Sequence, residues 1–530
     1  MLGAIAAFAC YLQLARTRAV NSDGASQALQ AWDMLHGNLL LHGWLLGDVS
    51  YYTTELPQYM LVEFLRGLNQ DVVHVAAAMT YTLATLLAAL LAKGNSTGRQ
   101  ALVRVLIAVG IMLAPQLASG VNILMSSPDH IGTSVPVMVV WLILDHAGPG
   151  GRPPGTPRDR GDPSPRTPLG TPLGTPLGYV PFIAGAFLGW AAVADTLVLF
   201  IGVLPLAGVC AIRACQAMVV ERKPLASQWY DMALGAAALL GAAAGVLALH
   251  VIHAHGGFYM PAPSAQLAQS GTTLVRNLGI AAQGLLLLGG ADFLGLRLTA
   301  STVFTMLHVV GVFLAALGTW LAARRFLRDR DLVAQLLVTG VAINLAAYVL
   351  STKANVITQT REIAVVLPFS AALAGRLLAG RLNASKLVPL LLVVLLGYLV
   401  GLAREISQPP VAVPNQQLTS WLASRHLHTG LSGYWESNVV TLTSGDRVQI
   451  RPVALSGGRL IPVAFELKTQ WYDPRRSTAN FVVLFPGVAG YPGFTPERAV
   501  LATFGKPART YHVGSYTVLV WNSNLLSELN

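Results

Sequence analysis

The sequence predicts a helical membrane protein with about eleven transmembrane helices, followed by a small C-terminal domain of α+β or all-β architecture. Of its 530 residues, 54% are hydrophobic and only 11% are charged, whereas soluble domains carry about 25% charged residues. Apolar runs of about 20 residues, long enough to cross a bilayer as helices, recur as far as residue 403. Beyond that point the sequence changes to short alternating segments separated by Gly, Pro, Asp and Asn, a pattern typical of strands and turns.

Each span is expected where an apolar run approaches the thickness of the hydrocarbon core. Asp195 is the only clear break between the fifth and sixth runs. The first run lacks a basic start, and Arg16 and Arg18 follow it where a signal peptide would be cleaved, so a short first span is expected. The expected spans lie near residues 1–16, 71–92, 101–118, 131–147, 178–193, 196–214, 231–253, 301–323, 332–350, 362–379 and 387–403.

Basic residues in alternate loops predict the orientation. By the positive-inside rule the loops rich in Lys and Arg face the cytoplasm. An odd number of spans then places the N-terminus in the cytoplasm and the C-terminal domain outside. The abundance of Ala, Leu, Gly and Arg with little Lys is typical of GC-rich bacteria and favours a bacterial plasma membrane. The basic residues are Lys93, Arg99, Arg152, Arg158, Arg160, Arg166, Arg213, Arg222, Lys223, Arg324, Arg325, Arg328, Arg330, Arg376, Arg381 and Lys386.

Two domains are therefore expected, a transmembrane domain over residues 1–403 and a soluble extracytoplasmic domain over residues 404–530. The outer loop 17–70 is long, polar and aromatic, and we expect it to hold two helices at the membrane surface. The segment 148–177 is rich in Pro, Gly and Arg and contains TPLG three times in a row. Such a composition cannot bury a core, so a disordered cytoplasmic linker is expected there.

The charge and cysteine content exclude other classes. The formal net charge is +11, but most arginines lie in short loops and not on one face of a domain, so nucleic-acid binding is not indicated. The lipid bilayer is the expected partner. Cys10, Cys210 and Cys215 all lie in or beside apolar runs, so neither a disulfide framework nor a cysteine metal site is indicated.

Acidic residues gather in the first outer loop. Asp23 follows the first span closely and begins a predicted helix, so on spacing alone N-capping by Ser22 or Asp23 is the commoner explanation. Capping does not explain why further acids and two histidines lie in the same loop beside a membrane. Trp32, Trp44, Tyr51 and Tyr52 have an alternative explanation as an interfacial aromatic belt. The clustered residues are Asp23, Asp33, Asp48, Glu55, His36 and His42.

Three segments of this loop resemble the first outer loop of the GT-C superfamily of integral-membrane glycosyltransferases. They are NSDGASQALQAWDMLHGN, WLLGD and YYTTELPQY. The similarity is greatest to the branch that holds protein O-mannosyltransferases and lipid A aminoarabinose transferases, and the matching positions are Asp23, Met34–Asn38 and Tyr51–Pro57. The sequence departs from the pattern at Gly24, where some relatives carry a second acid, so an acidic metal-binding pair is not expected there.

The resemblance implies a hexosyl- or pentosyltransferase that inverts the anomeric carbon of the sugar. The donor would be a sugar on a polyprenyl phosphate, with its tail in the bilayer, and the acceptor a glycan, lipid or protein outside. Asp23 would be the general base that takes the acceptor proton. No cofactor is certain, and a divalent cation is left open.

The departing phosphate needs cationic or N–H partners near the outer surface. Lys353 and Arg361, in STKANVITQTREIAVVLPF ahead of the tenth span, are the candidates, and Arg276 and Arg297 are weaker ones. The alternative is that these cations only anchor helix ends at the headgroups. The other expected substrate-binding residues are Asp48, Tyr52 and Glu55 from the first outer loop and Asp129 and His130 from SSPDHIGTS, although Ser127 or Asp129 also fits a helix cap.

Two other polar features have simpler explanations. Asp195 would be costly if it faced lipid, and capping of the sixth span is the commoner explanation for it. His250, His253 and His255 are spaced in a way that does not match a closed set of zinc ligands. The aromatic residues of the C-terminal domain are expected to form its core, and the domain itself is expected to cover the active site or to bind acceptor or glycan.

Two alternatives from other classes stay open. A multi-span transporter usually shows internal repeats and ionisable residues at mid-depth, whereas here the polar residues collect at one surface. A non-catalytic membrane protein that displays a glycan-binding domain would have no need of Asp23.

Overall fold

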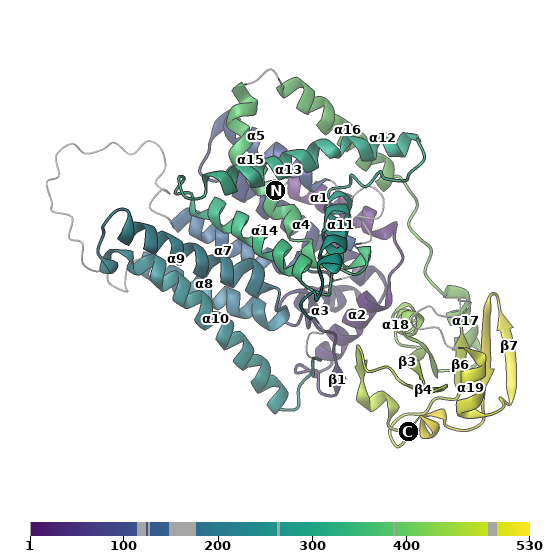
Figure 1. The fold of residues 1–530 in the computed structure, drawn as a ribbon. Helices are drawn as coiled ribbons and strands as arrows, with labels where there is room; N and C mark the ends of the chain where they lie inside the picture. The colour runs from purple at the N-terminus through teal and green to yellow at the C-terminus, as the bar shows by residue number, and fades with distance from the viewer. Residues whose placement is uncertain are drawn as a thin grey trace.

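The computed structural model describes residues 2–113, 123–125, 128–147, 176–261, 265–384, 387–485 and 496–529. A helical part comes first in the chain, and a sheet domain follows it on the side where α2 and α3 lie (Figure 1). The linker expected over 148–177 lies outside the described residues, except for its last two positions, which begin a helix.

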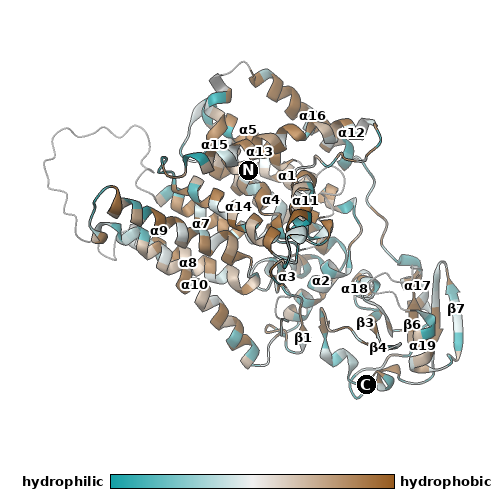
Figure 2. Cartoon of the chain, viewed as in Figure 1, coloured by the Kyte–Doolittle hydropathy of each residue, from teal (hydrophilic) through white to brown (hydrophobic). Residues whose placement is uncertain are grey.

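Each expected apolar run coincides with helix in the described part of the chain, and the end of the third run, 114–118, lies outside the described residues. In the described part of the chain, six helices are long and apolar enough to cross a membrane, or seven if the bent pair η4 (Ile357–Ile363) and α15 is one span. The chain is a multi-span membrane protein, and the hydrophobic colours of these helices contrast with the more polar sheet domain (Figure 2). The helices that coincide with the eleven expected runs, whether or not they meet that length, are α1 (Leu2–Arg16), α4 (Asp71–Lys93), α5 (Gly98–Met112), α7 (Ile131–Ala147), α8 (Pro176–Ala194), η2 (Leu199–Val203) with α9 (Leu204–Val219), α10 (Trp229–Ala254), α12 (Ala300–Leu307) with α13 (Val309–Arg325), α14 (Leu332–Leu350), α15 (Val366–Ala384) and α16 (Val388–Ile406).

Small residues let α8 and α10 pack backbone to backbone. A Cβ atom added at Gly185 would lie 2.5 Å from the carbonyl oxygen of Ala237, and one added at Gly189 would lie 2.5 Å from that of Gly241. Membrane helices associate through such close contacts because lipid offers no hydrophobic driving force between them.

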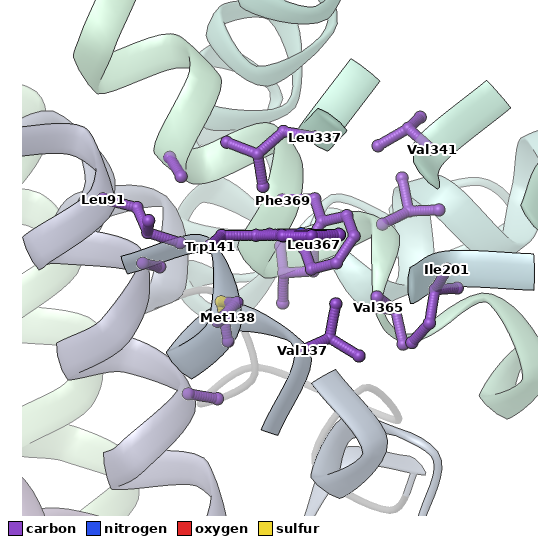
Figure 3. Close-up of a cluster of buried hydrophobic side chains, with 14 of the residues drawn as sticks. Leu91, Val137, Met138, Trp141, Ile201, Leu337, Val341, Val365, Leu367 and Phe369 are labelled. Atoms are coloured by element: carbon purple, nitrogen blue, oxygen red, sulfur yellow. The ribbon is translucent and has the colours of Figure 1, made fainter. Parts of the chain in front are cut away.

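A buried aromatic and aliphatic cluster joins α4, α7, α14 and α15 (Figure 3). Trp141 of α7 and Phe369 of α15 are fully buried in it, and Leu337 and Val365 lie beside them. Because this cluster fixes α7 and α15 relative to each other, it also sets the distance between the loops that precede these two helices. Both loops carry ionisable residues of the candidate site.

A buried ion cluster ties the opposite ends of the same helices together. Arg376 of α15 lies 2.7 Å from Asp145 of α7 and 2.6 Å from Asp331 at the start of α14. Arg376 also donates to the carbonyl of Leu91 in α4 at 2.9 Å. A guanidinium has enough donors to satisfy all three partners in one plane.

The first outer loop forms two helices, α2 (Ser22–Leu35) and α3 (Glu55–Arg66). Helix α3 buries Glu55 and Glu63 and exposes Leu61, Phe64 and Leu65. This is the reverse of a helix on a soluble protein, and it suits a helix whose outer face lies against lipid.

The C-terminal part is a mixed six-stranded sheet with strand order β4-β3-β2-β6-β8-β7. Strand β2 runs parallel to β3 and β6, and the remaining pairs are antiparallel. A parallel pair needs a crossover, which a helix, α18, supplies between β2 and β3. The all-β alternative is therefore wrong. The elements are α17 (Gln416–Ser424), β2 (Thr429–Gly433), α18 (Tyr434–Thr443), β3 (Gln449–Ser456), β4 (Arg459–Pro462), β6 (Phe481–Leu484), α19 (Glu497–Phe504), β7 (Arg509–Val513) and β8 (Tyr516–Val520).

A short sheet of two strands joins the first outer loop to the C-terminal part. Strand β1 (Trp44–Leu45) pairs antiparallel with β5 (Leu467–Lys468). Next to this pair, Lys468 Nζ lies 3.0 and 2.9 Å from the two carboxylate oxygens of Asp33 in α2. Backbone pairing together with a charge-assisted contact fixes the register between two segments more than 400 positions apart.

Candidate active site

Asp23 is not the cap of α2. Asn21 is the N-cap, and its side-chain oxygen accepts from the backbone N–H of Gly24 at 2.9 Å. The capping explanation for Ser22 and Asp23 is therefore wrong. The Asp23 carboxylate instead faces other side chains, with Oδ1 accepting from the Tyr434 hydroxyl at 2.7 Å and Oδ2 lying 3.9 Å from a guanidinium nitrogen of Arg361.

The C-terminal part supplies two residues beside Asp23. Tyr434 opens α18, and the hydroxyl of Ser22 donates to its carbonyl oxygen at 2.6 Å, which fixes it against α2. The Tyr434 hydroxyl also lies 2.6 Å from Oε2 of Glu466, whose side chain is buried. Burial raises the pKa of Asp23 above its ordinary value, although the hydrogen bond from Tyr434 and the charge of Arg361 oppose the shift.

A chain of alternating charges runs from the first outer loop into the helical part. Lys353 Nζ lies 2.7 Å from Asp48 Oδ2 and 3.4 Å from Glu362 Oε1. The other oxygen of Glu362 lies 3.2 Å from His130 Nε2, and His130 Nδ1 lies 2.7 Å from Asp195 Oδ2. Two cations thus join three acids, and each charged group lies next to a group of opposite charge.

The electrostatics of the chain keep both bridging groups positive. Burial lowers the pKa of His130, but the charges of Asp195 and Glu362 outweigh it and raise the value to about 10. Burial likewise raises the pKa of Asp48, but the hydrogen bond and charge of Lys353 outweigh it and hold the value below the ordinary one. His130 is therefore an imidazolium ion at neutral pH, able to donate from both ring nitrogens.

These charged residues line one cavity of about 690 Å³. Arg361 directly precedes Glu362 of the lining, and its side chain is 41% exposed. Burial lowers the pKa of Arg361, but the charges of Asp129 and Asp23 outweigh it. The cavity has both polar and apolar side chains in its wall. It is lined by Asp48, Val49, His130, Asp195, Thr196, Leu197, Phe200, Ala265, Asn344, Ala347, Tyr348, Ser351, Lys353 and Glu362.

Glu55 lies behind this cavity. It is 2% exposed, and burial raises its pKa to about 8. The Thr54 hydroxyl donates to Oε2, while Oε1 has no hydrogen-bond partner among the described residues. A Cβ atom at Gly132 in the first turn of α7 would overlap Oε1. A neutral Glu55 and a glycine opposite it are therefore what allow α3 and α7 to meet.

Replacing Gly132 with alanine is expected to lower the stability of the folded protein by about 1–3 kcal/mol, because the added methyl group displaces Glu55 or α7. Thermal unfolding in detergent measures the change. Gly208→Ala is the matched control, since no atom lies within 4 Å of a Cβ atom there. Truncation of the glutamate in the double variant Gly132→Ala/Glu55→Ala should restore part of the loss. Equal unfolding temperatures for Gly132→Ala and Gly208→Ala would contradict the contact.

Of the two neighbouring tyrosines, Tyr51 and not Tyr52 lies at the site. Tyr52 donates to the carbonyl of Leu39 at 2.8 Å, and its ring packs on Phe258. Tyr51 is buried with a φ of 51°, in the left-handed region that side chains other than glycine rarely adopt. Such strain persists only where surrounding structure holds it, and here the backbone N–H of Tyr51 donates to Ala194, directly before Asp195.

Asp129 lies beside the charged chain, next to His130 and within reach of the charge of Arg361, whereas the histidines of the other outer segments make separate contacts. Asp129 accepts from the backbone N–H of His130 at 2.7 Å, and burial raises its pKa to about 6. His36 and His42 contact backbone carbonyls. His250 and His255 are exposed, and within the described ranges no group of three or more potential metal ligands is found.

Besides Tyr51, four residues of the site were not among those expected from the sequence. Asp195 does accept from the backbone N–H of Leu197 as a cap would, but its other oxygen contacts His130. Its position inside an apolar run was a usable signal, and so was the adjacency of Glu362 to Arg361. Tyr434 and Glu466 carried no such signal, because long-range contacts place them beside α2: helix α18 packs on α2, and β5 pairs with β1.

Comparison with known proteins bears on the fold. No protein-family model and no curated protein sequence matches the chain. The structure of ArnT from Cupriavidus metallidurans bound to undecaprenyl phosphate aligns over 98% of this chain and 96% of ArnT, at 11% sequence identity and a TM-score of 0.54. The chain has the fold of ArnT. The resemblance to GT-C glycosyltransferases, and to their aminoarabinose transferase branch, is thereby confirmed at the level of the fold.

A second solved structure aligns less closely. The oligosaccharyltransferase of Archaeoglobus fulgidus, in its apo form, aligns over 91% of this chain and 69% of its own, at 12% identity and a TM-score of 0.47.

Proposed function

We propose that the chain is a membrane glycosyltransferase that moves a hexosyl or pentosyl group from a polyprenyl-phosphate donor to an extracytoplasmic acceptor with inversion. The observation that carries the proposal is the arrangement around Asp23. Its carboxylate is held by Tyr434 through one oxygen and faces the guanidinium of Arg361 with the other, beside the charged cavity and on the fold of ArnT.

An apolar groove supports a polyprenyl donor. It has a volume of about 1150 Å³ and runs among α11 (Gly271–Leu288), α13, α14 and α15. Val366 and Leu367, in the first turn of α15, line it, and they lie five and six residues after Arg361. A tail in the groove would therefore bring its phosphate to the segment that carries this cation. ArnT, which shares the fold, is bound to undecaprenyl phosphate.

The proposed reaction is a single displacement. The acceptor hydroxyl oxygen forms a bond to the anomeric carbon while the bond from that carbon to the phosphate oxygen breaks, and its electron pair leaves on the phosphate. Asp23 Oδ2 takes the acceptor proton as general base. Arg361 stabilises the negative charge that develops on the departing phosphate.

Lys353 and His130 have a different role in this proposal. Each is held between two carboxylates, so neither charge is free for a full ion pair with a phosphate. They fix Asp48, Glu362 and Asp195 around the cavity, where carboxylate oxygens accept from sugar hydroxyls. The acceptor would be a glycan, lipid or protein hydroxyl that reaches Asp23 from the outer side.

The proposed topology has about eleven spans, with the shorter helices α1, α5, α7 and α8 completing the set. The N-terminus would be cytoplasmic in a plasma membrane, with residues 1–403 forming the catalytic domain and residues 404–530 an extracytoplasmic domain. The charged cavity and the ion cluster around Arg376 lie at opposite ends of α15 and α7. This fits a catalytic site near the outer surface and an ion cluster near the cytoplasmic surface.

The proposal is tested with the purified protein and a panel of labelled polyprenyl-phosphate sugars, with a delipidated envelope extract as acceptor. Release of polyprenyl phosphate together with label in the acceptor is expected for at least one donor. A transporter or a glycan-binding scaffold would release none. If no member of a panel of hexosyl and pentosyl donors is consumed, the proposal is wrong.

A further inference from the structure

One hydroxyl group lies between two carboxyl groups at the site. The Tyr434 oxygen is 2.7 Å from Asp23 Oδ1 and 2.6 Å from Glu466 Oε2. A phenol carries one hydrogen, so it donates to one carboxyl only. The second short contact then requires a proton on the other carboxyl group, because two lone pairs at 2.6 to 2.7 Å would repel.

The surroundings decide which carboxyl holds that extra proton. Glu466 is 5% exposed, whereas Asp23 is more exposed and has Arg361 3.9 Å away to stabilise its negative charge. Burial and then the charge of Asp23 raise the pKa of Glu466 well above its ordinary value. Facing Glu466 are the hydroxyl groups of Tyr434, Ser26 and Tyr59, the carboxylate of Asp23 and, farther off, the guanidinium of Arg361.

The backbone fixes Glu466 in this place. It directly precedes β5, and a Cβ atom at Gly47, which follows β1, would lie 3.5 Å from Glu466 Oε1. Its φ of 48° lies in the left-handed region, a strained conformation that surrounding structure must maintain. Pairing of β1 with β5 and the contact between Lys468 and Asp33 supply that support.

We propose that Glu466 acts as a neutral carboxylic acid and a positioning residue, donating its proton to the Tyr434 oxygen so that the Tyr434 hydroxyl hydrogen is directed at Asp23. This inference rests on the proposed function, since it assigns Asp23 as the base. This hydrogen-bond relay, from Glu466 through Tyr434 to Asp23, holds Asp23 Oδ1 and leaves Oδ2 turned toward Arg361 and the acceptor. It also makes the C-terminal domain part of the catalytic centre.

An ionised Glu466 would have the opposite effect. It would compete for the Tyr434 hydrogen and place a second negative charge beside Asp23, which disfavours the charged form of the base. Glu466→Gln preserves the neutral relay, because the amide N–H₂ can donate to Tyr434. Glu466→Ala removes the donor, and Tyr434→Phe removes the link itself.

The rate of transfer is measured against pH for the full-length protein and these variants. We expect Glu466→Gln to keep kcat within about threefold of wild type, with the acidic limb of its pH–rate profile at the same pH. Glu466→Ala and Tyr434→Phe should lose about 10- to 100-fold in kcat, with little change in KM for the donor. Glu497→Gln, an exposed acid on α19, is the unaffected control. A Glu466→Gln variant as impaired as Glu466→Ala, or one with its acidic limb moved to lower pH, would overturn the proposal.

A measurement that needs no turnover separates this inference from the proposed function. In the difference spectrum of wild type minus Glu466→Gln at neutral pH, where the bands of other protonated carboxyl groups such as Glu55 cancel, we expect the infrared C=O band of a protonated Glu466. The same band is expected in the spectrum of Asp23→Asn minus the double variant Asp23→Asn/Glu466→Gln. The presence of this Glu466 band, together with the loss of transfer in Asp23→Asn, supports both proposals. If Asp23→Asn keeps its activity, the base assignment fails whatever the band shows. If the band is absent from the difference between wild type and Glu466→Gln, the neutral acid is wrong even when Asp23 proves essential.

Discussion

Replacing Asp23 with asparagine is expected to lower kcat for sugar transfer by roughly 10²- to 10⁴-fold, the range that a general base contributes. Asparagine keeps the size of the side chain and an oxygen that accepts from Tyr434, so the contact at 2.7 Å can survive. What it loses is the capacity to take a proton. KM for the donor should change little, because the donor phosphate is bound elsewhere.

The pH dependence of the wild-type protein adds a second readout. Burial raises the pKa of Asp23, and the base must be deprotonated to act. The rate should therefore rise with pH along a limb that lies above the ordinary aspartate value of 3.8. The matched control is Asp329→Asn, because that side chain is 48% exposed in a loop at the other end of the helices. Equal rates for Asp23→Asn and wild type would exclude Asp23 as the base.

Replacing Arg361 with alanine is expected to lower kcat by about 10²- to 10³-fold, as when a group that stabilises transition-state charge is removed. Its guanidinium is the cation nearest to Asp23 at 3.9 Å. Its loss should also move the acidic limb to higher pH, because its positive charge lowers the pKa of Asp23. Arg361→Lys should recover part of the rate but not the two-point contact with phosphate oxygens.

Arg276→Ala is the informative control for this prediction. Arg276 is an exposed cation on α11, whose far end borders the apolar groove, and the sequence left it as a weaker phosphate candidate. A normal rate for Arg276→Ala with a large loss for Arg361→Ala is the expected result. The reverse outcome would move the phosphate site to α11.

The helical part was predictable because membrane helices follow a simple physical rule. A backbone in lipid must satisfy its own hydrogen bonds, so each long apolar run becomes a helix, as at α4 and α14. The two helices expected in the outer loop 17–70 are likewise present as α2 and α3. The cap of α2 was not predictable, since Asn21, Ser22 and Asp23 are all good capping residues and only the structure shows that Asn21 takes the Gly24 amide.

The polar contacts of the site were only partly predictable. Residues such as Asp48 and Lys353 stood out because charged groups at a membrane surface are few, but nothing in the sequence indicates that they pair at 2.7 Å. Tyr52 was expected at the site and lies away from it, whereas its neighbour Tyr51 has a left-handed backbone conformation and lies near the charges of Asp129 and Asp195. Neighbouring residues cannot be told apart by composition when a strained backbone decides their direction.

Tyr434 and Glu466 show the limit of local reasoning. They come from a domain whose aromatic residues were expected to form its core, and their place beside Asp23 depends on the packing of α18 on α2 and on the pairing of β1 with β5. Such long-range registers are set by tertiary contacts, here Lys468 with Asp33, and not by periodicity.

The most direct test of the account is a cryo-electron microscopy structure of the protein with a polyprenyl phosphate. We expect the phosphate within about 4 Å of the Arg361 guanidinium, on the same side as Asp23 Oδ2, with the tail in the groove among α11, α13, α14 and α15. A phosphate bound instead at the basic residues of the opposite end, Arg213, Lys223 and Arg330, with Asp23 separated from any lipid, would contradict the central claim.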